Sequence, residues 1–362
     1  MAERAREADG IAMTGGYSLA TVGAKHVIDG ALPLVLGALD RLAPERGSGI
    51  FTMADFGCAD GGTSLDMVAT VLREVRRRAP ERPIAMVYTD QPRNDFNALF
   101  AIVQAPGRLD GIADLHVLAS ATSFYRRILP AGSLSLGFSA TAMHWISKRP
   151  CMIADHVQAV GATDAERGEF RAQALRDWET ILLARARELR SGGRLALANF
   201  CVDEEGRYLG HTTRVDMFDG FARHWRDLAR AGRISETEYV NATFQQFYKT
   251  PDEFAAPFRD PASQVSQAGL RLENIFTMVT PCPYAEAFRV HGNAQNFAKA
   301  YVPTLRSWSE TVFANALDPS RPAADRAAIV DALYGAYEAD VARAPEGHRM
   351  DYVHCVTEIV KG

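Results

Sequence analysis

The chain has 362 residues, of which 47% are hydrophobic and 23% charged, and it carries a formal net charge of −4 at pH 7. A chain of this size and composition can bury a sizeable core in one large domain or two. Its acidic balance provides no basic field for nucleic acid or an anionic membrane surface, so we expect neither partner.

The cysteines and the start of the chain indicate the compartment. Five cysteines are widely scattered with no C-x-x-C pair, which argues against a disulfide framework and against a zinc site. The first ten residues are charged and lack an apolar h-region, and no apolar run approaches the roughly 18 residues needed to span a bilayer. The sequence therefore predicts a cytoplasmic protein with no signal peptide and no bound metal.

In chain order, the first 200 residues alternate between helical and strand patterns. A flexible arm is expected at 1–12, followed by an apolar helix at about 21–42 that Pro33 kinks or splits. Buried strands are expected at 50–54, 84–89, 116–120, 134–139 and 194–200, with helices after residue 65 and at 165–190. This alternation favours a parallel, doubly wound α/β sheet.

The alternation breaks after Cys201. Residues 204–230 are expected to be helical and 232–257 irregular, and both are rich in aromatic side chains, which predicts a helical lid added to the sheet. The remaining expected elements are a strand at 270–279, helices at 295–316 and 323–344, and a last strand at 352–360 that pairs at the sheet end.

A glycine-rich turn follows the first strand, in the sequence A-D-F-G-C-A-D-G-G-T-S at 54–64. A strand, a turn and a helix in this order present backbone N–H groups to a ligand at the carboxyl end of a sheet. The spacing is not the G-x-G-x-x-G of dinucleotide enzymes, and no lysine follows Gly62 as a phosphate loop requires. Asp55 at the strand end suits a cationic amino group without phosphate, as in S-adenosylmethionine. An ordinary glycine turn is the structural alternative.

Three further stretches follow in order: T-D-Q-P-R-N-D-F-N at 89–97, S-F-Y-R-R-I-L-P at 123–130 and M-H-W-I-S-K-R-P at 143–150. Together with the glycine turn they resemble the SABATH family, the salicylate, benzoate and theobromine type of methyltransferases. The M-x-G-G at 13–16 and the Y-K-T-P-D-E at 248–253 also fit, so the resemblance runs from about residue 13 to 318. It implies a class I methyltransferase fold, a doubly wound, mostly parallel sheet with a helical lid, which agrees with the pattern of elements.

The resemblance also implies S-adenosyl-L-methionine as the cofactor, S-adenosyl-L-homocysteine as its product, and a homodimer. We accordingly expect five parts, which are a flexible arm (1–12), an N-terminal segment closing over the active site (13–46), a cofactor-binding α/β core (47–200), a lid forming the substrate pocket (201–265), and a segment completing sheet and lid (266–362).

For the cofactor, the resemblance implies a role for each matching residue. Asp55 and Gly57 would lie under the methionine part, Asp90 would hold the ribose and Gln91 would pack on the adenine. Ser123 would reach the adenine amino group, Phe124 would cover the ring, Ser139 would line the sulfonium end, and Tyr17 would close over the methyl group.

For the methyl acceptor, Trp145 is the leading candidate, because an indole N–H can donate a hydrogen bond to a carboxylate oxygen. A core tryptophan is the structural alternative. His144 can be a pocket wall, a second donor or a base. Met217, Phe218 and Phe247 fall where the family builds its apolar pocket, although such residues can equally be lid core.

One position departs from the family. The family's glutamine, which grips the acceptor carboxylate together with the tryptophan, corresponds here to Ala24, which has no donor. Lys25 or His26 can supply a cation if the helix register differs; otherwise the acceptor is not a simple carboxylate.

The predicted reaction is in-line S_N2 transfer of a methyl group to the carboxylate of a small aromatic or isoprenoid acid, giving a methyl ester. A carboxylic acid is ionised at pH 7, so no general base is needed. An N- or O-methyltransferase acting on a heterocycle or phenol is the first alternative. A dehydrogenase is disfavoured by the glycine spacing, and a non-catalytic binding module is a third alternative.

Overall fold

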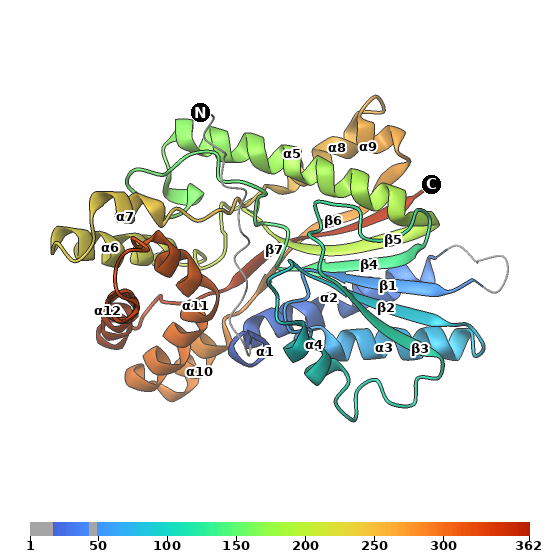
Figure 1. Cartoon of the computed structure of the whole chain (residues 1–362), viewed down its shortest axis with the longest axis horizontal. Helices are drawn as coiled ribbons and strands as arrows, with labels where there is room; N and C mark the ends of the chain where they lie inside the picture. The colour runs from blue at the N-terminus through green and yellow to red at the C-terminus, as the bar shows by residue number, and fades with distance from the viewer. Residues whose placement is uncertain (1–16, 43–48) are drawn as a thin grey trace.

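The computed structural model describes residues 17–42 and 49–362, and the fold is organised around one seven-stranded sheet (Figure 1). The strand order is β3-β2-β1-β4-β5-β7-β6. The strands are β1 (Phe51–Phe56), β2 (Ile84–Thr89), β3 (Leu115–Ser120), β4 (Leu134–Ala140), β5 (Leu189–Phe200), β6 (Leu270–Thr280) and β7 (Tyr352–Lys361). Strands β1 to β5 pair in parallel, and β7 is antiparallel to both of its neighbours. The predicted doubly wound, mostly parallel sheet is confirmed, whereas the arm predicted at 1–12 lies outside the described residues.

Helices cover both faces of the sheet and form a cap at one end (Figure 1). One face carries α2 (Val22–Asp40), α3 (Leu65–Arg78) and α4 (Phe96–Val103), and the other carries α5 (Asp164–Glu188), α8 (Pro251–Arg259) and α9 (Gln264–Gln267). The cap contains α6 (Met217–Arg230), α7 (Glu236–Asn241), α10 (Pro283–His291), α11 (Ala294–Ala316) and α12 (Ala323–Arg343). A short helix, α1 (Tyr17–Ala20), and a 3₁₀ turn, Ala159–Gly161, complete the set.

The sequence explains why these elements form. Strands β1 and β4 are buried at every residue because helices cover both sides, so they appear as continuous apolar runs. Helix α3 buries residues at helical spacing, including Met67, Val71 and Val75. Helix α5 begins at a capping box in which the side chains of Thr163 and Glu166 satisfy each other's backbone N–H groups.

The last strand does not lie at the sheet end, so this part of the prediction is wrong. Strand β7 is inserted between β5 and β6, and β6 forms the edge. Within β7, Glu358 is fully buried and accepts hydrogen bonds from Arg194 at 2.7 Å and from Arg41 at 3.1 Å. A buried carboxylate needs such partners, and these arginines come from β5 and from the end of α2. The presence of a charged residue in this strand is therefore explained by its arginine partners and not by exposure at a sheet edge.

Three helix predictions also need correction. Residues 204–216 are not helical, and the lid helix begins only at Met217, where Asp216 caps it. Helix α10 lies in a stretch for which no element was predicted. Helix α2 runs through Pro33 without splitting, so the split is wrong, while the kink stays a prediction. Its buried face, which includes Val27, Ala31 and Val35, packs against the sheet, and this tertiary contact outweighs the missing N–H of proline.

Helix α2 is also the one described helix that is long and apolar enough, by length and composition, to cross a membrane. The expectation that no apolar stretch is long enough to span a bilayer is therefore wrong when length and composition alone are considered. The helix lies against β4, β5 and β7 with eight of its residues buried. A helix at the core of a globular domain passes the same test.

Candidate functional site

A large cavity opens where the carboxyl ends of β1, β2 and β4 meet the cap. Its volume is about 1510 Å³, and its walls come from the glycine turn, the loops after the strands, and cap helices α11 and α12. Ligands of open α/β sheets bind outside the carboxyl ends of the strands, at this kind of topological switch point. The structure therefore brings the turn at 54–64 and the segment containing Trp145 to one space.

The glycine turn closes tightly under the cavity. Gly57 has a φ of +82°, and a Cβ atom there would lie 2.4 Å from the Cβ of Ala142, so only glycine fits. Asp55 lines the cavity and is 3% exposed, and its Oδ2 accepts a hydrogen bond from Ser64 Oγ at 2.6 Å. Burial raises the pKa of Asp55 to about 7, although the Ser64 hydrogen bond opposes the shift. No cationic side chain among residues 17–42 and 49–362 forms an ion pair with this carboxyl, so a ligand can supply the positive charge.

Asp90 follows β2 and faces the same cavity. Its two carboxylate oxygens accept from the N–H groups of Ala59 and Gln91, each at 2.7 Å. Burial raises the pKa of Asp90, and these two backbone hydrogen bonds oppose the shift. Each oxygen keeps a further lone pair, which is the arrangement that accepts two ribose hydroxyls. Gln91 also lines the cavity.

The loop carrying Ser123 and Phe124 is fixed by a buried ion pair from α5. Arg185 and Glu188 are fully buried, with Arg185 Nε 2.6 Å from a Glu188 oxygen. Arg185 donates to the carbonyl of Phe124 at 2.9 Å, and Glu188 accepts from Leu129 N at 3.1 Å. Both Ser123 and Phe124 line the cavity. The ion pair was not found from the sequence, although two charges three residues apart on the buried face of a helix are its signal.

Ser139 does not reach the cavity wall. Its side chain is fully buried and donates to the carbonyl of Phe56 at 2.7 Å, whereas its neighbours Phe138 and Ala140 line the cavity. Side chains alternate between the two faces of a strand, so a shift of one residue separates the predicted position from the observed one.

Tyr17 projects into the cavity from α1. Burial raises the pKa of its phenol above the ordinary value, and a hydrogen bond with Thr141 opposes the shift. Thr141 follows β4 and has a φ of +56°, an uncommon backbone conformation that concentrates at functional sites. The phenol is therefore neutral and held next to the end of β4.

Trp145 and His144 both line the cavity. Trp145 is partly exposed there, and its carbonyl accepts a hydrogen bond from the hydroxyl of Tyr125. His144 is 4% exposed, and its ring lies 4.7 Å from that of Phe200. Burial, together with the neighbouring His354 and Lys249, lowers the pKa of His144 well below its usual range. This imidazole is therefore neutral at pH 7.

The apolar wall is not made by the residues predicted for it. Met217, Phe218 and Phe247 are buried but are not among the residues that line the cavity. The aromatic and aliphatic side chains that do line it include Phe200, Leu209, Trp308, Val312, Met350 and Tyr352. They come from four separate parts of the chain, so no local pattern identified them.

The first long helix does not supply a charged group to the cavity. Ala24 is 1% exposed and lies in the core, and the α2 residue that lines the cavity is Ile28. The ammonium of Lys25 lies outside, 2.9 Å from Asp29 and 3.1 Å from Asp66. The structure therefore does not bring Lys25 to the other predicted site residues.

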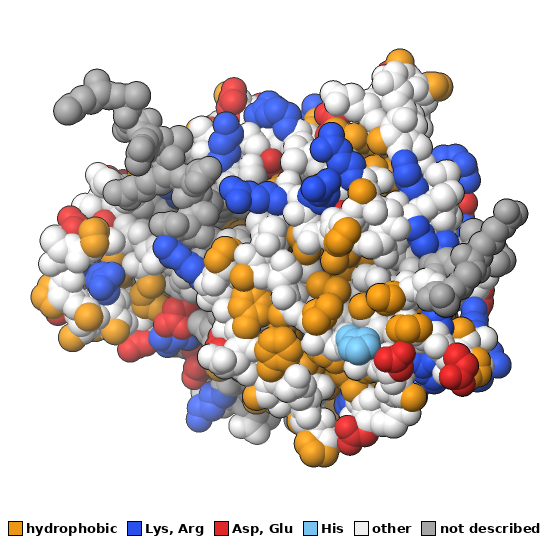
Figure 2. All heavy atoms as spheres, turned by 45° about the vertical axis from the view of Figure 1, so that its right-hand side comes forward, with side chains coloured by type: hydrophobic (Ala, Val, Ile, Leu, Met, Phe, Trp, Pro, Cys, Tyr) orange, Lys and Arg blue, Asp and Glu red, His pale blue; other side chains and the backbone are white. Residues whose placement is uncertain are grey.

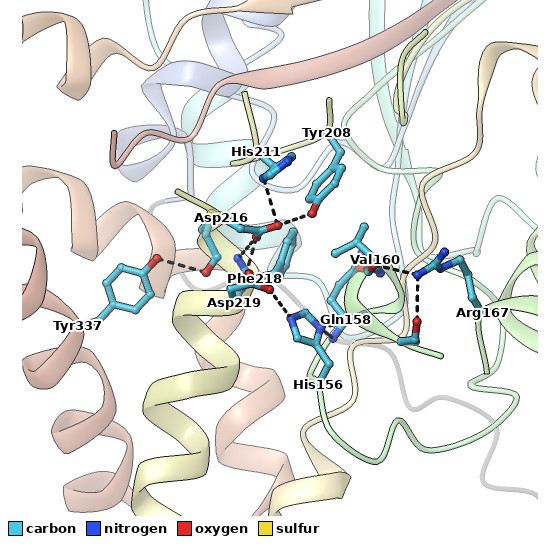
Figure 3. A network of polar contacts seen from close by, with 12 residues as sticks. His156, Gln158, Val160, Arg167, Tyr208, His211, Asp216, Phe218, Asp219 and Tyr337 are labelled. Carbon is cyan, nitrogen blue, oxygen red and sulfur yellow. Dashed lines mark hydrogen bonds and ion pairs between the residues drawn. The ribbon is translucent and has the colours of Figure 1, made fainter. Parts of the chain in front are cut away.

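A polar network fixes the lid helix α6 beside the cavity (Figure 3). Asp216 caps the helix by accepting from Phe218 N at 2.7 Å, and it also accepts from the hydroxyl of Tyr208. Asp219, in the first turn, lies 3.2 Å from His156 Nε2. His156 in turn is 2.8 Å from the carbonyl of Gln158. The network thus ties the lid to the segment that follows Trp145.

Within the described residues, no group of three or more histidine, cysteine, aspartate or glutamate side chains is placed to hold a metal ion.

Comparison with known proteins agrees with this geometry. The family model described as SAM dependent carboxyl methyltransferase matches residues 14–359. The chain is 24% identical over 249 residues to gibberellic acid methyltransferase 2 of Arabidopsis thaliana, covering 62% of this chain and 63% of the relative. It is 30% identical over 226 residues to indole-3-acetate O-methyltransferase 1 of Oryza sativa subsp. japonica, covering 52% and 55%.

The matched part thus spans less than two thirds of the length of these curated relatives. Among solved structures, loganic acid methyltransferase with SAH superposes with a TM-score of 0.76 at 21% identity, covering 97% of this chain and 99% of that one, which establishes the shared fold. The family model covers almost the whole chain, and the predicted family is confirmed. The chain belongs to the S-adenosylmethionine-dependent carboxyl methyltransferase family.

Proposed function

We propose that this protein methylates the carboxylate of a small organic acid and releases its methyl ester. The observation that supports this most directly is that one cavity of about 1510 Å³ joins Asp55 and Asp90 to Trp145. A cofactor held at the acidic end and an acid held at Trp145 would then share one cavity. The relatives named for gibberellic acid and indole-3-acetate make small carboxylic acids the first substrates to test.

The residues at the acidic end fit S-adenosylmethionine. Asp55 is buried with no ion-pair partner in the described part of the chain, and its raised pKa would fall if an ammonium group bound beside it. Asp90 offers acceptor lone pairs to ribose hydroxyls. When bound, the cofactor supplies an electrophilic methyl group on a sulfonium.

At the other end, this chain's residues would orient the acid and exclude water. The indole N–H of Trp145 has no acceptor among the described residues and can donate to a carboxylate oxygen. Phe200, Trp308 and Tyr352 give the cavity an apolar wall, which strengthens that hydrogen bond. Correct placement of the oxygen is the main contribution, because a carboxylate is already ionised at pH 7 and needs no base.

The test is transfer of label from S-adenosylmethionine to a panel of benzoate, indole-3-acetate, gibberellic acid and loganic acid. We expect a product that mild alkali hydrolyses, as it does a methyl ester. A labelled product that survives alkali would reject the ester. Cofactor binding by calorimetry without any transfer would reject the proposed function for this panel and leave a binding module.

A second candidate is an N- or O-methyltransferase acting on a heterocycle or phenol. Ala24 favours it, because α2 carries no donor for a second carboxylate oxygen at this position. Such an acceptor must lose a proton, and His144 is the histidine that lines the cavity. The lowered pKa of His144 makes it a weak base, so we place this candidate second.

We also propose that the protein works as a cytoplasmic homodimer. The five cysteines are all unpaired, as is usual in a reducing compartment. Figure 2 shows hydrophobic side chains gathered in the middle of one face, which is the kind of surface through which copies of a chain associate. Light scattering behind size-exclusion chromatography tests the assembly, and a mass of one chain at micromolar concentration would reject the dimer.

A further inference from the structure

We infer that Gln246 is the second group that grips the acceptor carboxylate, next to Trp145. The inference rests on the proposed function, because it assigns a role in binding a carboxylate. Helix α2 supplies no donor for the second carboxylate oxygen. Ala24 is buried in the core and Lys25 is paired with two aspartates outside, so neither can hold the second oxygen.

The backbone places Gln246 directly opposite Trp145. The two residues form an isolated antiparallel bridge. The hydrogen bonds on either side run from Ile146 N to the Gln245 carbonyl and from Phe247 N to the His144 carbonyl, each at 3.0 Å. This is the pattern of a non-hydrogen-bonded pair, in which the Cα atoms are about 4.5 Å apart and both side chains leave on the same side. Both side chains line the cavity, as this geometry requires.

The amide of Gln246 is oriented, and one end of it is unused. Its Oε1 accepts a hydrogen bond from the hydroxyl of Tyr248 at 3.3 Å, and the residue is 1% exposed. Among the described residues, none accepts a hydrogen bond from its Nε2. With the oxygen committed to Tyr248, the NH₂ group is left to the cavity. An amide NH₂ beside an indole N–H can hold the two oxygens of one carboxylate.

Tyr248 is itself held in place. Its side chain is buried, and its hydroxyl donates to Gln246 Oε1 at 3.3 Å. Its ring lies 5.6 Å from that of Phe200 and 5.8 Å from that of His144. Tyr248 is therefore a positioning residue that keeps the Gln246 amide from turning its oxygen toward the carboxylate.

Other polar groups near Trp145 are less suited to this role. The Nε2 of Gln245 already donates to the Ile146 carbonyl at 2.6 Å. Arg149 donates to the carbonyls of Asn241 and Thr243, at 2.9 Å and 3.3 Å. Trp308 has a buried N–H without a partner among the described residues, but it packs with Phe218 and Phe244 in the cap, and no backbone pairing places it beside Trp145.

The test compares Gln246→Met and Gln246→Glu with the unmodified protein. Methionine keeps the length and removes the donor, whereas glutamate keeps an acceptor for Tyr248 and places a negative charge at the carboxylate. The measurement is the affinity of the best acid of the panel for protein saturated with S-adenosylhomocysteine, by calorimetry, together with KM and kcat for that acid. We expect the affinity to fall about tenfold to a hundredfold in Gln246→Met and further in Gln246→Glu.

Three controls separate the possible failures. Affinity for S-adenosylhomocysteine should stay within error in both variants, since a folding defect would change it, and Gln246→Met should also keep the melting temperature. Tyr248→Phe should raise KM by a smaller factor, with kcat retained. If the unmodified protein methylates acids and both variants keep its KM, the role of Gln246 is refuted while the proposed function stands. If the unmodified protein neither binds nor methylates any acid of the panel, both are refuted.

Discussion

Ser18 donates two hydrogen bonds to the same oxygen of Asp60, one from its backbone N and one from its Oγ, each at 2.9 Å. Asp60 lies in the glycine turn, where its other oxygen accepts from Gly62 N at 3.1 Å. One carboxylate thus ties α1, which carries Tyr17, to the loop beneath the cofactor end of the cavity. Gly62 makes room for this contact, because a Cβ there would lie 2.4 Å from Ser18 Oγ.

The first prediction follows from this link. Asp60→Ala should release α1 and lower the affinity for S-adenosylhomocysteine roughly tenfold, because hydrogen bonds to a charged group contribute about 1.5–3 kcal/mol. Calorimetric titration measures this affinity. Ser18→Ala removes one of the two hydrogen bonds and should give a smaller loss. An Asp60→Ala protein with unchanged affinity would show that α1 is held by other contacts.

The second prediction concerns pH and Asp55. Its pKa of about 7 in the folded protein lies above the value of an unfolded carboxyl, near 3.9. Its contribution to stability is therefore complete below about pH 4 and is lost as the pH rises through about 7. Binding of an ammonium group has the opposite dependence, because it needs the ionised carboxylate. Affinity for S-adenosylhomocysteine should be roughly tenfold weaker at pH 6 than at pH 8.

Two variants check the assignment of this pH dependence. Asp55→Asn should flatten it between pH 6 and 8. Ser64→Ala removes the hydrogen bond that lowers the pKa of Asp55, so its midpoint should move to higher pH. A midpoint that stays in place in both variants would assign the titration to another group.

The third prediction concerns the ribose site. Asp90→Ala should weaken S-adenosylhomocysteine binding by about 1.5–3 kcal/mol, roughly tenfold to 150-fold, through loss of a charged acceptor. Asp95→Ala is the matched control in the same loop. Asp95 caps α4 by accepting from Ala98 N at 3.0 Å, so its loss should cost about 1 kcal/mol of stability without affecting affinity. Equal effects of both variants on affinity would contradict the site.

The fourth prediction concerns Trp145. Trp145→Phe keeps an aromatic wall and removes the N–H, so KM for the acid should rise about tenfold while cofactor affinity is retained. Trp178→Phe is the control, since Trp178 is fully buried and donates to the Phe254 carbonyl at 3.1 Å. It should lower the melting temperature and leave KM alone. An unaffected KM in Trp145→Phe would make Trp145 a structural residue.

The fifth prediction separates the two candidate functions through His144. For ester formation, His144→Gln should change kcat less than tenfold, and the pH profile between 6 and 9 should keep its shape, because this imidazole is neutral throughout that range. General-base catalysis typically contributes about 10²–10⁴-fold. A loss of that size, with a pH-dependent limb removed, would favour the heterocycle or phenol methyltransferase.

The two ends of the cavity differed in how far the sequence could predict them. The cofactor end is made by residues next to strand ends, so Asp55 and Asp90 could be placed once the strands were known. The prediction that Ser139 lines the cavity was wrong by one residue. Strand β4 is buried on both faces, so its sequence lacks the alternation that would show which side chains face the ligand.

The acceptor end depends on contacts between distant parts of the chain. Phe200 ends β5, Trp308 is in α11 and Tyr352 begins β7, and only the arrangement of the cap brings them together. Gln246 became visible as a partner of Trp145 through a two-residue bridge that carries no sequence signal. The role of a buried charge such as Glu358 likewise cannot be predicted until its partners in the fold are known.

The position of β7 has a consequence for synthesis of the protein on the ribosome. Strands β5 and β6 are complete long before residues 352–361 emerge, yet both need β7 as their neighbour. Until then, each presents an unpaired edge able to pair with another chain. The nascent protein therefore passes through a stage prone to aggregation, in which chaperone binding would increase yield, and a ribosome stalled before residue 352 would hold a chain unable to close its sheet.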